Sequence, residues 1–280
     1  MAALILSGPG ADRLQSEGAE FQQPEMSPLN LAVNLDDLAT VRRLLKAGAD
    51  PNGTHPKTLL MNAIGRNHEE VALALIAAGA DIEYRGWNIG SPPLLMAAHF
   101  EANRVIAGLL ISGADPDGAN AAEFTALMGV AFTGDLVAAH MLLDAGARVD
   151  RRSLKGVTVL HCIDPKRFNP KLMRLFIDRG ANVNAVTVDR KVFRQVEEQL
   201  LRDWQVPFSE PGFFDLAEKT PLMIAARHGI IDAAKMLLER GADLHFENSY
   251  GESATYMARE AGHEEMLQFL ERVAAEAAER

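Results

Sequence analysis

The 280-residue sequence contains one cysteine, Cys162, and no run of about 18 or more apolar residues. A single cysteine excludes a disulfide within the chain and is typical of a reducing compartment. The missing apolar run argues against a membrane-spanning helix. The apolar start of the chain lacks the basic residues of a secretory signal, and Gly8 interrupts it. We therefore expect a soluble, cytoplasmic protein that does not bind membranes.

Basic residues are also scarce. The 28 Lys and Arg residues are outnumbered by 38 Asp and Glu residues, so the formal net charge is −10. Proteins that bind nucleic acids without sequence preference need a positive surface for the phosphate backbone. We therefore expect no nucleic-acid partner. The hydrophobic content of 48% and the charged content of 24% are those of a folded globular protein.

The sequence also lacks the common motifs of catalytic and ligand sites. It contains no Gly-x-Gly-x-x-Gly, phosphate-binding loop, His-Glu-x-x-His or Gly-x-Ser-x-Gly. Adjacent carboxylates such as Asp36 and Asp37 diverge by about 100° on a helix and do not converge on a substrate. We interpret the neighbouring His161 and Cys162 as buried structural residues of one helix. The prediction is that the chain is not an enzyme and holds neither a cofactor nor a metal.

The chain does contain an internal repeat, whose period is about 33 residues. A Gly-Ala pair follows an apolar run again and again, and a Ser, Thr or Pro close to a leucine precedes most of these glycines at a constant distance. The glycines are Gly48, Gly79, Gly113, Gly146, Gly180 and Gly241. The first five recur at nearly equal intervals, and the last interval is almost twice as long. Such a period indicates a solenoid of stacked units.

The recurring residues suit a pair of antiparallel helices. The Ser or Thr caps the first helix by accepting a hydrogen bond from an otherwise unpaired backbone amide. Proline suits the first helical position, as at Pro221 after Thr220. Small residues such as Ala97 and Ala98 let the two helices approach closely. The glycine ends the second helix in the left-handed conformation.

This pattern resembles the ankyrin repeat, which has a period of about 33 residues and a Thr-Pro-Leu-His-x-Ala signature. Thr220-Pro221-Leu222 and the Thr158 to His161 segment match parts of the signature. The resemblance covers about residues 22–280 and implies an all-α solenoid of about seven helix-turn-helix repeats after a flexible tail, 1–21. The repeats are expected near 22–52, 53–86, 87–119, 120–152, 153–186, 215–247 and 248–280.

The interval from Gly180 to Gly241 exceeds one period, and we assign the surplus to an insertion over 187–214, between the fifth and sixth repeats. Apolar residues recur there at steps of four, which predicts an amphipathic helix of about 17 residues. They are Val188, Val192, Val196, Leu200 and Trp204. An aromatic-rich stretch with Phe208 and Phe213 follows. Two interpretations remain open: the insertion overhangs the concave face and contacts a partner, or it packs on its own solenoid as a brace.

The resemblance implies a non-catalytic protein–protein interaction module. It would bind a folded partner through its concave groove, loop tips and insertion, as an adaptor, an inhibitor or an antitoxin-like neutraliser. The alternatives are a small-molecule binder or enzyme with its site in 187–214, and a structural spacer. The basic stretch 151–174 is either a solvated edge or a patch for an acidic partner. The predicted partner contacts are Tyr84, Trp87, His99, Phe100, Phe124, Phe132, Arg151, Arg152, Trp204, Phe208, Phe213, Arg227 and His228.

Overall fold

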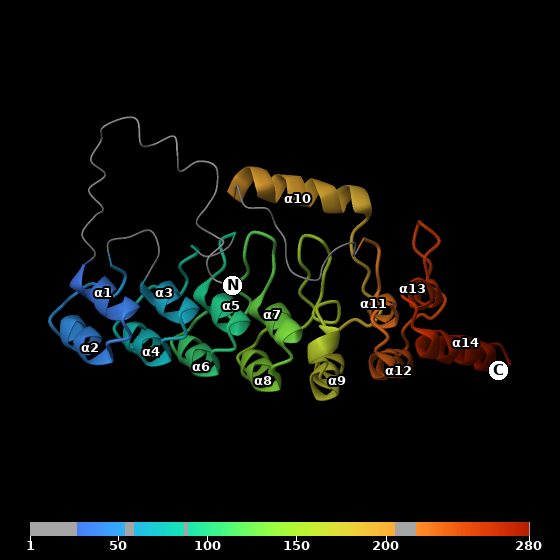
Figure 1. Cartoon of the computed structure of the whole chain (residues 1–280), viewed down its shortest axis with the longest axis horizontal. Coiled ribbons are helices and arrows are strands. Elements are labelled where there is room, and N and C mark those ends of the chain that lie inside the picture. Colours follow the sequence, from blue (N-terminus) through green and yellow to red (C-terminus); the bar gives the residue numbers. More distant parts are fainter. Residues whose placement is uncertain (1–26, 54–58, 87–88, 205–216, 280) are drawn as a thin grey trace.

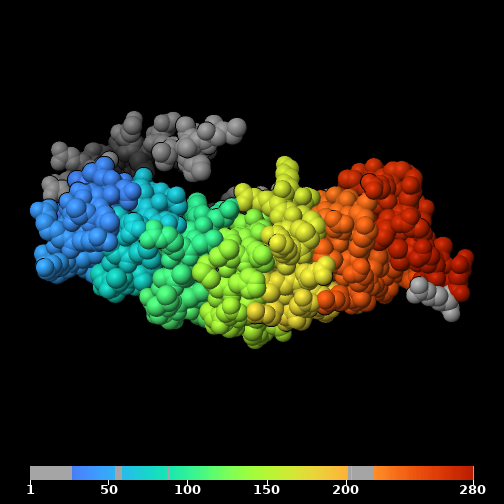
Figure 2. Space-filling model, turned by 90° about the horizontal axis from the view of Figure 1, so that it is seen from below, coloured from blue at the N-terminus to red at the C-terminus, as the bar shows by residue number. Residues whose placement is uncertain are grey.

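The computed structural model describes residues 27–53, 59–86, 89–204 and 217–279. Regular secondary structure in these ranges is helical, apart from one isolated bridge between Ala119 and Thr125. Pairs of helices stack side by side in chain order along one long axis (Figures 1 and 2). Among the described helices, none has both the length and the apolar character needed to cross a bilayer. The predicted all-α solenoid is confirmed.

The first helices of the pairs form one layer of the solenoid (Figure 1). Their starts follow the predicted caps: the hydroxyls of Thr125 and Thr220 accept hydrogen bonds from the backbone amides of Met128 and Met223, at 3.4 and 3.2 Å. This layer contains α1 (Pro28–Asn34), α3 (Leu59–Gly65), α5 (Pro93–His99), α7 (Ala126–Thr133), α11 (Pro221–Arg227) and α13 (Ala254–Glu260).

The second helices form a parallel layer beneath the first (Figure 1). Left-handed glycines follow them, as predicted, with φ of 91° at Gly48 and 82° at Gly241. Leucines between the layers, such as Leu109 and Leu142, are fully buried. The second layer contains α2 (Leu38–Lys46), α4 (Glu69–Ala77), α6 (Asn103–Ile111), α8 (Leu136–Asp144), α9 (Pro170–Asp178), α12 (Ile231–Glu239) and α14 (Glu264–Ala278).

Loops that join one repeat to the next project from the first layer on the side away from the second (Figure 1). We call the described parts of them, residues 81–86 with 89–92, 115–125, 148–158, 182–188 with 217–220, and 243–253, the finger loops. A polar side chain in one finger loop accepts a hydrogen bond from a backbone amide at the base of the next. The pairs are Asp115 with Glu83 at 2.7 Å, Arg148 with Asp117 at 2.9 Å, and Asp243 with Asn184 at 2.8 Å.

The fifth repeat differs from the predicted helix-turn-helix form because its first helix is absent. Residues 159–161 form a turn, and a short 3-10 helix at Pro165–Arg167 precedes α9. Pro165 has no amide hydrogen, and it disfavours the helical conformation at Asp164. The stretch from Thr158 to the α9 cap, Asn169, is also one residue longer than that from Thr125 to the α8 cap, Asp135. The prediction that His161 and Cys162 lie on a helix is therefore wrong.

His161 is nevertheless buried and hydrogen-bonded at both ring nitrogens. Its Nδ1 accepts from the backbone amide of Thr158 at 3.2 Å, and its Nε2 lies 3.1 Å from the carbonyl oxygen of Lys219 in the sixth repeat. A carbonyl oxygen only accepts, so Nε2 carries the hydrogen of the neutral ring. Burial lowers the pKa of His161 to about 4. The histidine thus joins the fifth repeat to the sixth in its neutral form.

The lowered pKa of His161 predicts a loss of stability in acid. The ordinary pKa is 6.5, so as the pH falls below it the unfolded chain binds a proton that the folded chain does not bind until about pH 4. The free energy of unfolding in urea should fall by about 3 kcal/mol between pH 7.5 and pH 4 through this residue. His161→Gln should remove this component and lower stability at pH 7.5. Equal pH dependence in both proteins would contradict the assignment.

Candidate functional site

Helix α10 (Arg190–Trp204) lies across the ends of the finger loops (Figure 1). The chain leaves a finger loop after Val188 and rejoins it at Glu218, whose backbone amide donates to the carbonyl oxygen of Val188 at 3.0 Å. Asp189 caps the helix by accepting from the backbone amides of Lys191 and Val192, at 2.8 and 2.9 Å. Both ends of the intervening segment therefore belong to the same loop.

Apolar residues of α10 pack against the solenoid. Leu200 is buried in a small cluster with Ile89 and Ala122, which precede α5 and α7. Near the other end of the helix, Phe193 is buried beneath the ammonium group of Lys155, which lies 4.0 Å from the ring centroid. The helix thus runs along the solenoid from the fifth repeat to the third.

The contact between Lys155 and α10 combines charge with burial. Lys155 is buried, and its ammonium group donates to the Glu197 carboxylate at 2.9 Å while it also lies over Phe193. A charged group loses hydration when it is buried and needs nearby opposite charge or hydrogen-bond acceptors. Helix α10 supplies both the carboxylate and the aromatic ring. These contacts support the interpretation of this segment as a brace.

The basic stretch 151–174 also makes contacts within the chain. Besides Lys155, three of its side chains bind other repeats or loops, and two of these contacts are ion pairs that offset its positive charge. They are Arg151 with the Glu123 carboxylate at 2.7 Å, Arg152 with the Val186 carbonyl oxygen, and Arg167 with the Glu101 carboxylate. Lys166, Lys171 and Arg174 are exposed. The two predicted contacts Arg151 and Arg152 are therefore already engaged by their own chain.

The other predicted contacts lie in different environments. His99 and Phe100 are exposed at the end of α5 and contact each other edge to face, with ring centroids 5.2 Å apart. Phe132, Arg227 and His228 are partly buried at the ends of α7 and α11. These two helices are separated by the irregular fifth repeat, so the residues do not form one cluster.

Phe124 is buried, with 8% of its surface exposed, and belongs to the core. The side-chain oxygen of Asn120 accepts from the backbone amides of Ala122 and Phe124, both at 3.0 Å, and closes a turn that holds Phe124 against the solenoid. Phe124 is therefore a core residue and not an exposed contact for a partner. Trp87, Phe208 and Phe213 lie outside the described residues, and only the backbone of Trp204 is described.

The predicted contacts do not include Leu31 and Leu35, although the position of Leu35 within its repeat is that of a predicted contact. Leu35 follows the cap Ser27 by eight residues, as Phe100 follows Pro92, and both side chains are exposed. We call the first-helix layer and the finger loops together the first-helix face. Six of the eight exposed large hydrophobic side chains among the described residues lie on it: Leu31, Leu35, Phe100, Leu154, Tyr250 and Tyr256.

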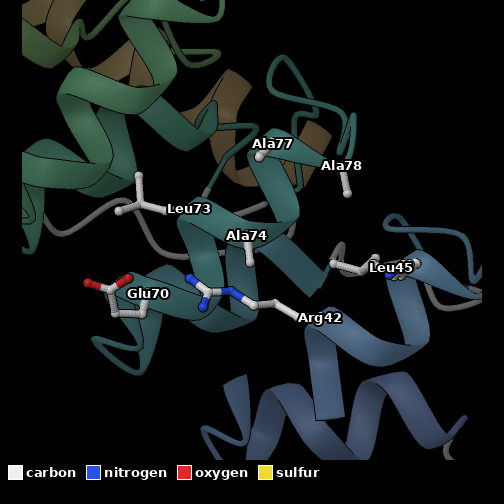
Figure 3. A pocket seen from close by; sticks show the side chains of 8 residues that line it. Arg42, Leu45, Glu70, Leu73, Ala74, Ala77 and Ala78 are labelled. Carbon is white, nitrogen blue, oxygen red and sulfur yellow. The ribbon is translucent and has the colours of Figure 1, made fainter. Parts of the chain in front are cut away.

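A groove of about 430 Å³ lies between α2 and α4 on the opposite layer (Figure 3). Its walls include Leu73, Ala74 and Ala77 of α4, and the side chain of Arg42 extends from α2 toward Glu70. The Glu70 carboxylate forms an ion pair with Arg104 of α6 at 2.6 Å. The groove is therefore the space between neighbouring second helices and contains none of the predicted contacts.

Comparisons with known proteins find ankyrin repeats in the chain. A model of three ankyrin repeats matches residues 195–277, and a model of a single ankyrin repeat matches 25–55. The ankyrin repeat domain of human ASB11 superposes with a TM-score of 0.65 at 20% identity, covering 87% of this chain and 97% of that domain. The protein is an ankyrin repeat protein. Ankyrin repeats generally mediate protein–protein interactions.

The ankyrin repeat domain of Bcl-3, a member of the IkappaB family, superposes with a TM-score of 0.61 at 22% identity and covers 86% of this ankyrin repeat protein and 98% of that domain. Ankyrin repeat protein T5 of Rabbit fibroma virus is 27% identical to it over 268 residues, which are 85% of this chain and 54% of the viral protein.

Two further relatives are named palmitoyltransferases. The putative palmitoyltransferase ZDHHC13 of Danio rerio is 28% identical over 232 residues, and palmitoyltransferase AKR1 of Lachancea kluyveri is 24% identical over 220 residues. The alignments cover 82% and 64% of this ankyrin repeat protein but 32% and 30% of the relatives. The chain therefore spans about a third of these two proteins.

These two relatives overturn the prediction that the ankyrin repeat protein is not an enzyme. That prediction rested on the absence of short catalytic motifs, whereas the similarity to proteins named for an enzymatic activity extends over most of the chain. Short motifs register only chemistry whose residues lie close together in sequence. The absence of such motifs therefore does not exclude an enzymatic role that is suggested by similarity over most of the chain.

Removal of the Glu197 carboxylate should loosen α10. Glu197→Gln leaves the buried ammonium group of Lys155 without this opposite charge. Because the Glu197 side chain is 44% exposed, we expect a loss on the order of 1 kcal/mol. Hydrogen exchange at the α10 amides should become about fivefold faster. Lys191→Gln, which removes a charge from an exposed side chain of the same helix, is the control, and equal exchange in both variants would contradict the brace.

Proposed function

We propose that this ankyrin repeat protein binds a folded protein partner through its first-helix face. The observation that carries the proposal is the placement of six of the eight exposed large hydrophobic side chains of the described residues on this face. Exposed apolar groups that gather on one face mark interaction sites, because association removes their surface from water. His99, Phe132, Arg227 and His228 lie on the same face and would add polar and aromatic contacts.

The first-helix face is organised before any partner arrives. Hydrogen bonds such as that from the Asp115 amide to Glu83 connect successive finger loops, and α10 joins the loops of three repeats through Leu200 and Phe193. A surface that is already ordered loses little conformational entropy when it binds. This favours recognition of a folded partner with a complementary shape.

The outer side of α10 extends the proposed contact surface. Lys191, Arg194 and Glu198 are exposed on the helix while its apolar side packs on the finger loops. The brace and the contact surface are therefore opposite sides of one element. Mixed charge at the edge of an interface contributes to the choice and orientation of the partner more than to affinity.

The proposal is tested with two matched double variants. Leu35→Ala with Phe100→Ala removes two exposed apolar groups from the first-helix face, whereas Ile111→Ala with Val137→Ala removes two from the second-helix layer. A partner isolated with the wild-type chain should bind the first variant at least about tenfold more weakly in calorimetry, as expected for contacts worth about 1–2 kcal/mol. The second variant should bind as the wild type does. Equal affinities, or no partner at all, would overturn the proposal.

The two relatives named palmitoyltransferase favour a second candidate function, a role in protein palmitoylation. In such a reaction, a cysteine thiolate of the acceptor protein attacks the carbonyl carbon of an activated palmitoyl thioester. A new thioester forms on the acceptor, and the original thiol leaves. The ankyrin repeats would hold the acceptor protein while this transfer occurs. The same first-helix face would then determine which protein is acylated.

Acyl labelling of the partner distinguishes this candidate from binding alone. Cells expressing the wild-type chain are supplied with an alkyne analogue of palmitate, and the isolated partner is examined for label that hydroxylamine releases from thioesters. The candidate predicts a labelled partner and a several-fold loss of label with Leu35→Ala, Phe100→Ala. A partner that binds but carries no such label would refute palmitoylation and leave the binding proposal intact.

A further inference from the structure

A pocket of about 280 Å³ opens on the first-helix face between α3 and α5. Drug-sized ligands occupy pockets of about 300–1,000 Å³, so this one suits one or two side chains better than a cofactor. Its lining combines thioether and aromatic groups with one amide and one guanidinium. The lining residues are Met61, Asn62, Gly65, Arg66, Tyr84, Gly86 and Met96.

Two glycines let side chains of the pocket wall pack closely against the backbone. A Cβ atom at Gly65 would lie 2.7 Å from the Cε methyl of Met96, and one at Gly86 would lie 2.0 Å from Cε1 of Tyr84. Carbon atoms in ordinary contact are about 3.5–4.0 Å apart. Any larger residue at either position would therefore displace the neighbouring Met96 or Tyr84 side chain. The two glycines therefore determine where Met96 and Tyr84 lie in the wall of the pocket.

A positive charge stands at the rim of this apolar pocket. The Nε of Arg66 donates to the side-chain oxygen of Asn62 at 2.9 Å, and the Asn62 amide donates in turn to Asn34 of α1. Arg66 is exposed, and no carboxylate of the described residues forms an ion pair with it. Asn62 thus accepts from the Nε edge of the Arg66 guanidinium. The two terminal amino groups of Arg66 face solvent and can bind an acceptor there.

Building on the proposed function, we propose that this pocket receives an apolar side chain of the partner whose next residue is acidic. Methionine side chains are flexible and polarizable, so Met61 and Met96 adapt to an inserted apolar group. The neighbouring carboxylate would bind Arg66 in a charge-assisted hydrogen bond. The occupant is therefore a short apolar-acidic segment of a protein, and the charge complementarity with Arg66 defines which side of the pocket the carboxylate occupies.

The probe is the peptide acetyl-Ser-Leu-Asp-Ser-amide, compared with acetyl-Ser-Leu-Asn-Ser-amide and acetyl-Ser-Ala-Asp-Ser-amide. It is titrated into the full chain carrying ¹³C-methyl methionine, and the methyl resonances of Met61 and Met96 are followed by NMR. Both methyl resonances should shift when the Leu-Asp peptide is added. Each comparison peptide should bind with about tenfold lower affinity, as measured from the concentration dependence of the same shifts. Met141 and Met236, on the second-helix layer, should not move and report that the fold is intact.

Variants test each part of the pocket. Gly65→Leu should fill it and abolish the shifts, and Gly86→Ala, in a finger loop, should weaken them because the added Cβ displaces Tyr84 from the pocket wall. Arg66→Gln should make the Leu-Asp and Leu-Asn peptides bind equally. Arg174→Gln, a change of an exposed arginine of α9 on the second-helix layer, is the control and should behave as the wild type does.

Failure of the pocket and failure of the proposed function give different results. No shift at Met61 or Met96, or shifts that persist with Gly65→Leu, would overturn the pocket even if the partner still depends on Leu35 and Phe100. Equal binding of the Leu-Asp and Leu-Asn peptides to the wild type would overturn the role of Arg66. A partner that binds the Leu35→Ala, Phe100→Ala variant as tightly as the wild type, with peptide binding to the pocket retained, would instead overturn the wider face.

Discussion

Each helix pair of this ankyrin repeat protein is stable only because the neighbouring pairs cover its apolar sides. Leucines such as Leu109 and Leu142 are buried between stacked repeats, and no single pair of such short helices could bury them alone. The finger loops add polar contacts of the same period, as between Arg148 and Asp117. Stacking therefore determines both the core and the spacing of groups on the surface.

The fifth repeat shows how that stacking survives a local defect. Its first helix is missing, yet two buried polar side chains join it to other elements: His161 bonds to the backbone of Lys219, and Lys155 contacts Glu197 and Phe193 of α10. Both groups are fully hydrogen-bonded or paired where they are buried, as the cost of burying polar atoms requires. Polar contacts over long sequence distances replace part of the packing that the absent helix would have supplied.

Features with a local cause were predictable from sequence. Capping threonines, left-handed glycines and the repeat period are read from short segments, and the amphipathic pattern from Val188 to Trp204 indicated α10. The docking of α10 was not predictable, because Leu200 meets Ile89 and Ala122, which belong to repeats much earlier in the chain. Pro165 is a local signal against a helix in the fifth repeat, but the period of the repeats predicted one there. The pocket beside Arg66 was not predictable, because it forms where Tyr84 and Gly86 of a finger loop meet residues of two different helices, α3 and α5.

The position of α10 also changes how the solenoid can come apart. In an array where each unit touches only its neighbours, unfolding behaves as a one-dimensional process that can begin at any weak unit and spread outward. Helix α10 contacts loops of the third, fourth and fifth repeats at once. Separating any of these three repeats disturbs a contact of α10 with the others, so we expect the middle of the array to melt as one cooperative block and the two ends to fray first.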